Sequence, residues 1–124
     1  MSDLVRIAID AMGGDRGPTV TVPASISYLQ NYPQTEFHLF GDELLINDAL
    51  EKFEIKTVQS QITIVPCASL VTDGDRPSKT LRAKQDSSMA QAVRAIRDGT
   101  CDACISAGNT GALMAFGMQS LGTL

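Results

Sequence analysis

Two glycine-rich segments, residues 10–18 and 106–111, have the composition of turns that bind anions. Glycine adopts positive φ at little cost and lets the backbone approach a ligand closely. Successive backbone N–H groups in such turns can surround an anion, and a helix start adds the positive end of its dipole. Each segment can also be a plain tight turn between a strand and a helix, with no ligand.

The first segment combines glycines with two carboxylates. Gly13 and Gly14 would bring backbone N–H groups to a substrate, whereas Asp10 and Asp15 would repel a phosphate that they faced. We therefore expect one of these aspartates to orient a basic side chain, or to accept a hydrogen bond from an uncharged part of the substrate. The segment matches neither the P-loop nor the dinucleotide-binding fingerprint.

The second segment carries neutral hydrogen-bonding side chains, including that of Ser106, at a predicted helix start. Gly108 is expected to permit a sharp turn, Asn109 to tolerate a left-handed backbone, and Thr110 to cap the helix. Gly111 follows in the first helical turn, where unpaired N–H groups favour an anion.

A basic cluster lies between the two segments, although the chain is acidic overall. Four of the ten basic residues fall within nine positions, and this local reversal of charge favours a polyanion or an acidic partner. Arginine can bind phosphate through two parallel hydrogen bonds. A solvated loop without a ligand is the alternative. The four residues are Arg76, Lys79, Arg82 and Lys84.

Cys101 and Cys104 form a C-x-x-C pattern, but their place between a helix end and a strand favours packing over redox chemistry. A zinc site would need further ligands, and Cys67 and His38 are not spaced to supply them. His38 lies in an apolar strand pattern, which favours a structural role. The sequence therefore predicts no metal site and no cofactor. The methionines expected to fill the core are Met89, Met114 and Met118.

Strands and helices alternate along the chain. Short apolar runs bounded by turn residues predict strands over residues 4–10, 36–41, 61–66 and 103–106. Capped or periodic segments predict helices over residues 19–32, 42–53, 88–98 and 110–121. This alternation predicts an α/β fold with a mostly parallel sheet flanked by helices, in which ligands bind beyond the carboxyl ends of the strands. Both glycine-rich segments fall at those ends.

Helix starts and one long loop complete this prediction. Asp42 is the expected N-cap of the second helix, and Ser87 or Ser88 that of the third, where both serines add donors at a helix start. Residues 67–86 are polar and show no periodicity. A loop of that length in a compact domain is usually functional or mobile.

The bulk composition fits one globular domain. The chain has 124 residues, 44% of them hydrophobic, and a net charge of −4, which argues against a nucleic-acid-binding protein. Neither a membrane-spanning segment nor a secretory signal is visible, so we expect a cytoplasmic protein. Only residues 122–124 follow the last predicted helix. We therefore expect residues 1–124 to be a single N-terminal α/β segment of a longer enzyme.

The chain resembles the bacterial phosphate acyltransferases of phospholipid synthesis, over its length up to Leu121. Four stretches carry the resemblance in the same order, and only together are they specific. The resemblance covers the first part of such an enzyme. It implies a fold similar to the isocitrate and isopropylmalate dehydrogenases and the phosphotransacetylases. The matching residues are 7–18, 75–78 with Arg82, 87–89 and 105–114.

The resemblance also implies an activity and partners. A long-chain acyl group passes from acyl carrier protein to orthophosphate, which gives acyl phosphate and free carrier. Family members are homodimers that associate peripherally with the membrane. Phosphate is already a nucleophile, so the reaction needs positioning of a polyanion and donors for the developing oxyanion.

Within that reaction, the site residues have expected roles. Asp10 and Asn109 are candidate catalytic residues, and Arg76, Lys79 and Lys84 are candidates for docking the acidic carrier. The candidates for binding the phosphate or the thioester end are Gly13, Gly14, Asp15, Arg82, Ser87, Ser88, Gly108, Thr110 and Gly111.

Two other functions stay open. The first is an enzyme of the same fold that acts on a small acyl phosphate, or on a hydroxy acid with a nucleotide, although no nucleotide fingerprint is present. The second is a non-catalytic fragment, if the natural chain ends at Leu124.

Overall fold

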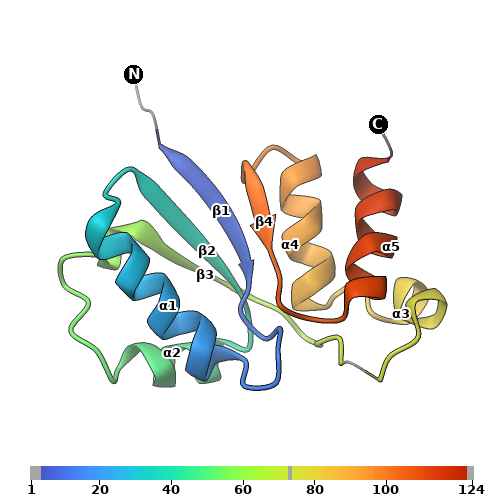
Figure 1. Cartoon of the computed structure of the whole chain (residues 1–124), viewed down its shortest axis with the longest axis horizontal. Coiled ribbons are helices and arrows are strands. Elements are labelled where there is room, and N and C mark those ends of the chain that lie inside the picture. The colour runs from blue at the N-terminus through green and yellow to red at the C-terminus, as the bar shows by residue number, and fades with distance from the viewer. Residues whose placement is uncertain (1–3, 73, 123–124) are drawn as a thin grey trace.

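Four parallel strands form one sheet in a computed structural model that describes residues 4–72 and 74–122 (Figure 1). The strand order is β3-β2-β1-β4, and every neighbouring pair is parallel. This confirms the predicted α/β class and is consistent with part of a phosphotransacetylase-like fold. The strands are β1 (Val5–Asp10), β2 (Thr35–Gly41), β3 (Ile62–Pro66) and β4 (Ala103–Ile105).

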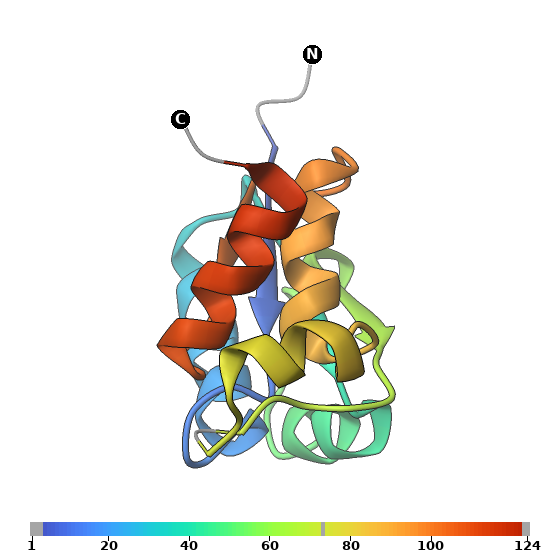
Figure 2. The ribbon, with the colours of Figure 1, turned by 90° about the vertical axis from the view of Figure 1, so that its right-hand side faces the viewer.

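Helices cover both faces of the sheet. The helices α1 and α2 lie on one face, and α4 and α5 lie side by side on the other (Figure 1). The short helix α3 packs against α5, near the carboxyl ends of the strands (Figure 2). The bounds are α1 (Pro18–Asn31), α2 (Glu43–Leu50), α3 (Pro77–Ala83), α4 (Ser88–Arg97) and α5 (Thr110–Leu121), with a 3₁₀ turn η1 at Gln59–Gln61.

The central strands are apolar on both faces because helices bury both. In β2, Phe37 and Leu39 belong to the apolar cluster that includes α1 and α2. Phe40 packs with Ala8 of β1 in the cluster that includes α4. Continuous apolar runs of this kind are typical of parallel strands. Strand β1 is therefore buried between two layers of helices.

The prediction of an unbroken loop over residues 67–86 is wrong, because Pro77–Ala83 forms helix α3. Pro77 supplies the fixed φ that suits a first helical turn. The helix gave no periodic signal because Thr80 is its one buried residue. By contrast, the prediction for Asp42 is confirmed, since its carboxylate accepts hydrogen bonds from two backbone N–H groups of α2.

The outer side of α5 differs from the prediction. Met89 is buried, but Met114 and Met118 are 64% and 58% exposed, so their expected place in the core is wrong. Helix α5 is apolar on most sides, and its periodicity therefore could not show that Ala112 and Phe116 would form the packed face. Within residues 4–72 and 74–122, no helix has both the length and the apolar composition needed to cross a bilayer.

Candidate active site at the carboxyl ends of β1 and β4

The two glycine-rich segments start side by side. Strands β1 and β4 pair with Ile9 opposite Ile105, so the next residues, Asp10 and Ser106, meet at the carboxyl edge of the sheet. Both segments continue from this point into loops that lead to α1 and α5. The predicted convergence of the two segments at one edge is therefore present.

A buried carboxylate joins three elements here. The Asp10 side chain is buried, and its Oδ1 accepts a hydrogen bond from Ser88 Oγ of α4 at 2.5 Å. Its Oδ2 accepts one from Ser106 Oγ at 2.8 Å. No basic side chain of the described residues bonds to Asp10, so two neutral hydroxyl groups satisfy this carboxylate. We call Asp10, Ser88 and Ser106 the Asp10 junction.

Glycine at position 13 allows the second segment to lie against the first. A Cβ atom on Gly13 would lie 3.0 Å from Asp10 Oδ2 and 3.0 Å from the backbone nitrogen of Gly108. One residue further, Gly14 adopts a φ of 86°, which favours glycine. A side chain at position 13 would therefore push the two segments apart.

Several backbone N–H groups around the junction have no acceptor among the described residues. These groups belong to residues 14–17 of the first segment and to Thr110 and Gly111 of the second. The N–H group of Gly108 differs, because it donates to Ser106 Oγ at 3.1 Å. The unpaired groups have the character of the anion site that the sequence predicts.

Asn109, and not Thr110, is the N-cap of α5. Its Oδ1 accepts a hydrogen bond from the Ala112 N–H at 3.0 Å, and its φ of −58° excludes the expected left-handed backbone. Its Nδ2 donates to the carbonyl oxygens of Thr72 and Asp75, at 3.1 and 2.8 Å. Asn109 thus fastens the segment before α3 to the start of α5.

Ser87 and Ser88 stand at the start of α4 and have different partners. Ser87 caps α4 by accepting a hydrogen bond from the Ala90 N–H at 3.1 Å, which decides between the two expected caps. Ser88 donates to Asp10, and neither serine is more than 1% exposed. Ser88 therefore links α4 to the first glycine-rich segment, whereas Ser87 caps α4, and direct binding of substrate by either serine stays a prediction.

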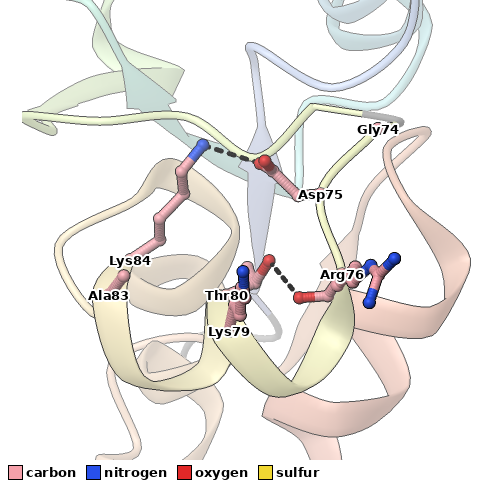
Figure 3. Close-up of a pocket in the computed structure, with 7 residues that line it drawn as sticks. All are labelled: Gly74, Asp75, Arg76, Lys79, Thr80, Ala83 and Lys84. Carbon is pink, nitrogen blue, oxygen red and sulfur yellow. Dashed lines mark hydrogen bonds and ion pairs between the residues drawn. The ribbon is translucent and has the colours of Figure 1, made fainter.

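A second polar region lies beside this site, and Figure 3 shows its lining. Lys84 Nζ donates to Asp75 Oδ2 at 2.6 Å and to the carbonyl oxygen of Leu70 at 2.8 Å. The hydrogen bond from Lys84 lowers the pKa of the Asp75 carboxyl below its usual range. This basic pocket has a volume of about 330 Å³ and is lined by Gly74, Asp75, Arg76, Lys79, Thr80, Ala83 and Lys84.

The other predicted basic residues are exposed. Arg76, Lys79 and Arg82 are exposed, and their side chains bond to no group among residues 4–72 and 74–122. In Figure 3 the Arg76 guanidinium points away from the pair formed by Lys84 and Asp75. Asp15 of the first glycine-rich segment is exposed as well. These side chains are therefore available to a partner or a substrate.

The cysteines and the histidine lie outside the site chemistry. All three cysteines are free thiols, and Cys101 is buried. Burial, together with the negative charge of Asp10, raises the pKa of Cys67 and of Cys104 to about 11, which disfavours the reactive thiolate. His38 Nε2 lies 2.7 Å from a Glu36 carboxylate oxygen within β2.

Fold and site together define an α/β protein whose candidate ligand site lies beyond the carboxyl ends of adjacent parallel strands. Residues 5–124 match the family described as fatty acid synthesis protein, and the chain belongs to this family.

Its relatives include proteins named phosphate acyltransferase, in agreement with the resemblance. One from Shewanella amazonensis is 49% identical over 111 residues, which cover 90% of this chain and 32% of the relative. Relatives from Paraburkholderia phytofirmans and Shewanella sediminis are 42% and 45% identical over 120 residues, or 97% of this chain and 32% and 35% of the relatives. The chain thus spans about a third of the length of these relatives.

Proposed function

We propose that this chain contributes to the transfer of a long-chain fatty acyl group from acyl carrier protein to orthophosphate, which yields acyl phosphate and free carrier. One observation carries the proposal: two glycine-rich segments meet over the buried carboxylate of Asp10 and present backbone N–H groups without acceptors among the described residues. The name of the relatives supports acyl transfer involving phosphate, and the family description supports a role in fatty acid synthesis.

In the proposed reaction, a phosphate oxygen attacks the thioester carbonyl carbon. The carbon–sulfur bond then breaks, the sulfur takes up the proton that the attacking phosphate gives up, and the carrier leaves with a free thiol. The N–H groups of residues 14–17, Thr110 and Gly111 hold the phosphate and the developing oxyanion. Asp10 and Asn109, which the sequence marks as candidate catalytic residues, act in this proposal as positioning residues that fix the turns holding the reactants.

The basic pocket suits the acidic carrier protein. Lys79 and Arg76 are exposed and unpaired among the described residues, whereas Lys84 is already bound to Asp75. Lys79 and Arg76 therefore make the first contact in this proposal, and Lys84 shapes the pocket. Arg82, which is exposed on the same helix, and Asp15 remain proposed substrate-binding residues.

The resemblance carries further proposals about the whole protein. Residues 1–124 are proposed to be the N-terminal segment of a longer cytoplasmic enzyme, which forms a homodimer and associates peripherally with the membrane. The share of the relatives that the chain spans supports a longer protein.

The activity is tested with purified full-length protein and a long-chain acyl-carrier thioester. We expect loss of the thioester only in the presence of phosphate, with equal formation of acyl phosphate, detected as hydroxamate after addition of hydroxylamine. A short-chain acyl-CoA donor should react far more slowly, which separates this enzyme from one that makes a small acyl phosphate. Thioester loss that does not depend on phosphate would contradict the proposal.

A further inference from the structure

We propose that Ser106 is a positioning residue that fixes the second glycine-rich segment to Asp10, so that the two segments act as one site. Ser106 lies directly after β4, and its hydroxyl group bonds in both directions. It donates to Asp10 Oδ2 at 2.8 Å and accepts from the Gly108 N–H at 3.1 Å. The inference rests on the proposed function.

The chemistry of the groups fixes the direction of both bonds. An ionised carboxylate can only accept, and a backbone N–H can only donate. The Ser106 hydroxyl must therefore give its proton to Asp10 and receive the Gly108 N–H on a lone pair. If the Ser106 hydroxyl turned away from this orientation, at least one of its two bonds would break. The orientation of the Gly108 turn therefore follows the position of Asp10.

Close packing leaves the bridge little freedom. A Cβ atom on Gly13 would lie 3.2 Å from Ser106 Oγ, and one on Gly108 would lie 3.3 Å from it. Ser88 holds the other carboxylate oxygen, which keeps Asp10 from turning away. A serine after a strand often bonds to the N–H two residues on, but that local turn does not need a second bond to a buried carboxylate. The second bond is what joins the two segments.

Loss of the bridge should affect the chemical step more than carrier binding. Ser106→Ala leaves the Gly108 N–H without its acceptor and Asp10 Oδ2 without its donor, so the turn can shift. Misplacement of reacting groups by about 1 Å can cost about 100-fold in rate. We expect kcat to fall about 10- to 100-fold, with the KM for the carrier unchanged because the basic pocket is intact.

The test compares three variants in the full-length protein. Ser106→Thr keeps the hydroxyl group and should restore most of kcat. The control is Ser25→Ala, which removes a buried serine of α1 whose hydroxyl bonds to the Thr21 carbonyl oxygen. We expect the control to keep its kcat, although it loses some stability.

Hydrogen exchange of the Gly108 amide, followed by NMR, reports on the bridge without any assay of activity. Exchange at Gly108 should quicken in Ser106→Ala and stay unchanged in Ser25→Ala. The inference is overturned if Gly108 exchange does not change in Ser106→Ala, or if folded Ser106→Ala keeps the wild-type kcat. Equal losses of kcat in folded Ala and Thr variants would also overturn it, since they assign the effect to packing. If the wild-type protein makes no acyl phosphate, the proposed function fails, while the exchange measurement still decides on the bridge.

Discussion

The Asp10 junction and the basic pocket are neighbouring polar regions that differ in how far their charged groups are buried and paired. At the junction the Asp10 carboxylate is buried, and each of its oxygens accepts a hydrogen bond from a serine hydroxyl group. In the pocket, Lys79 and Arg76 are exposed and unpaired among the described residues. Buried polar groups are costly to leave unsatisfied, whereas exposed charges are screened by salt and act mainly on encounter with a partner. Changes at the junction should therefore alter stability and kcat, and changes in the pocket should alter recognition.

The largest effect is expected for Asp10→Ala. This change removes the acceptor of two hydroxyl groups, one of which belongs to the fully buried Ser88. Hydrogen bonds to charged groups contribute about 1.5–3 kcal/mol each, so the free energy of unfolding should fall by about 3 kcal/mol or more. Urea unfolding measures the change. The control Asp48→Ala, on the exposed side of α2, should stay within about 0.5 kcal/mol. A loss at Asp10 no larger than that of the control would contradict the account.

Two glycine substitutions test how tightly the junction is packed. A Cβ atom on Gly13 meets the Gly108 backbone and Asp10 at 3.0 Å, and neither can move freely. A Cβ atom on Gly108 meets Met89 Cε at 2.9 Å, which is the end of a flexible side chain. Overpacking typically costs about 1–3 kcal/mol, and Gly13→Ala should lie higher in that range than Gly108→Ala. The reverse order in thermal or urea unfolding would show that the two segments are not tightly packed against each other at Gly13.

In the basic pocket, Lys79→Glu should change recognition without changing stability. The charge reversal opposes an acidic carrier, so the KM for the carrier should rise several-fold and depend less on salt. The free energy of unfolding should stay within about 0.5 kcal/mol of wild type. Lys52→Glu, which follows α2, serves as the matched control. If both reversals changed the KM equally, the carrier would not dock at this pocket.

The smallest effect is expected for the pair formed by Asp75 and Lys84. The pKa of Asp75 is lowered in the folded protein, so the pair stabilises the fold above the ordinary carboxyl pKa of about 4. That contribution is lost as the pH falls through the folded pKa. Asp75→Asn should therefore lower Tm slightly at pH 7, and the difference from wild type should shrink as the pH falls through the lowered pKa of Asp75. A difference in Tm that does not vary with pH would exclude this pair as its source.

Much of the fold could be predicted because its signals are local. Apolar runs and turn residues marked the strands, and the position of Asp42 marked the start of α2. The sequence pattern did not predict helix α3, because that helix buries only one residue. It did not predict the packed face of α5, because that helix is apolar on most sides. Both Asn109 and Thr110 were reasonable caps, and only the backbone of the turn decided between them.

The candidate site was predictable in its parts but not in its connections. The sequence points to Asp10, Ser106 and the glycines as polar or flexible residues near strand ends, and to Ser87 and Ser88 as donors at a helix start. It could not show that Asp10 bonds to Ser88 and Ser106, which lie 78 and 96 positions further along the chain. Those contacts depend on the strand order and register. For the same reason, the sequence predicts hydrogen bonds from Ser106 but does not identify Asp10 as its partner.

In the proposed site, both glycine-rich segments bind one phosphate together. Amide hydrogen exchange of the full-length protein, with and without phosphate and in the absence of the carrier, tests this most directly. We predict slower exchange at residues 14–17 and 110–111 together, with the carrier-docking residues 76–79 unchanged. Protection confined to residues 74–84, or to one glycine-rich segment alone, would contradict the claim.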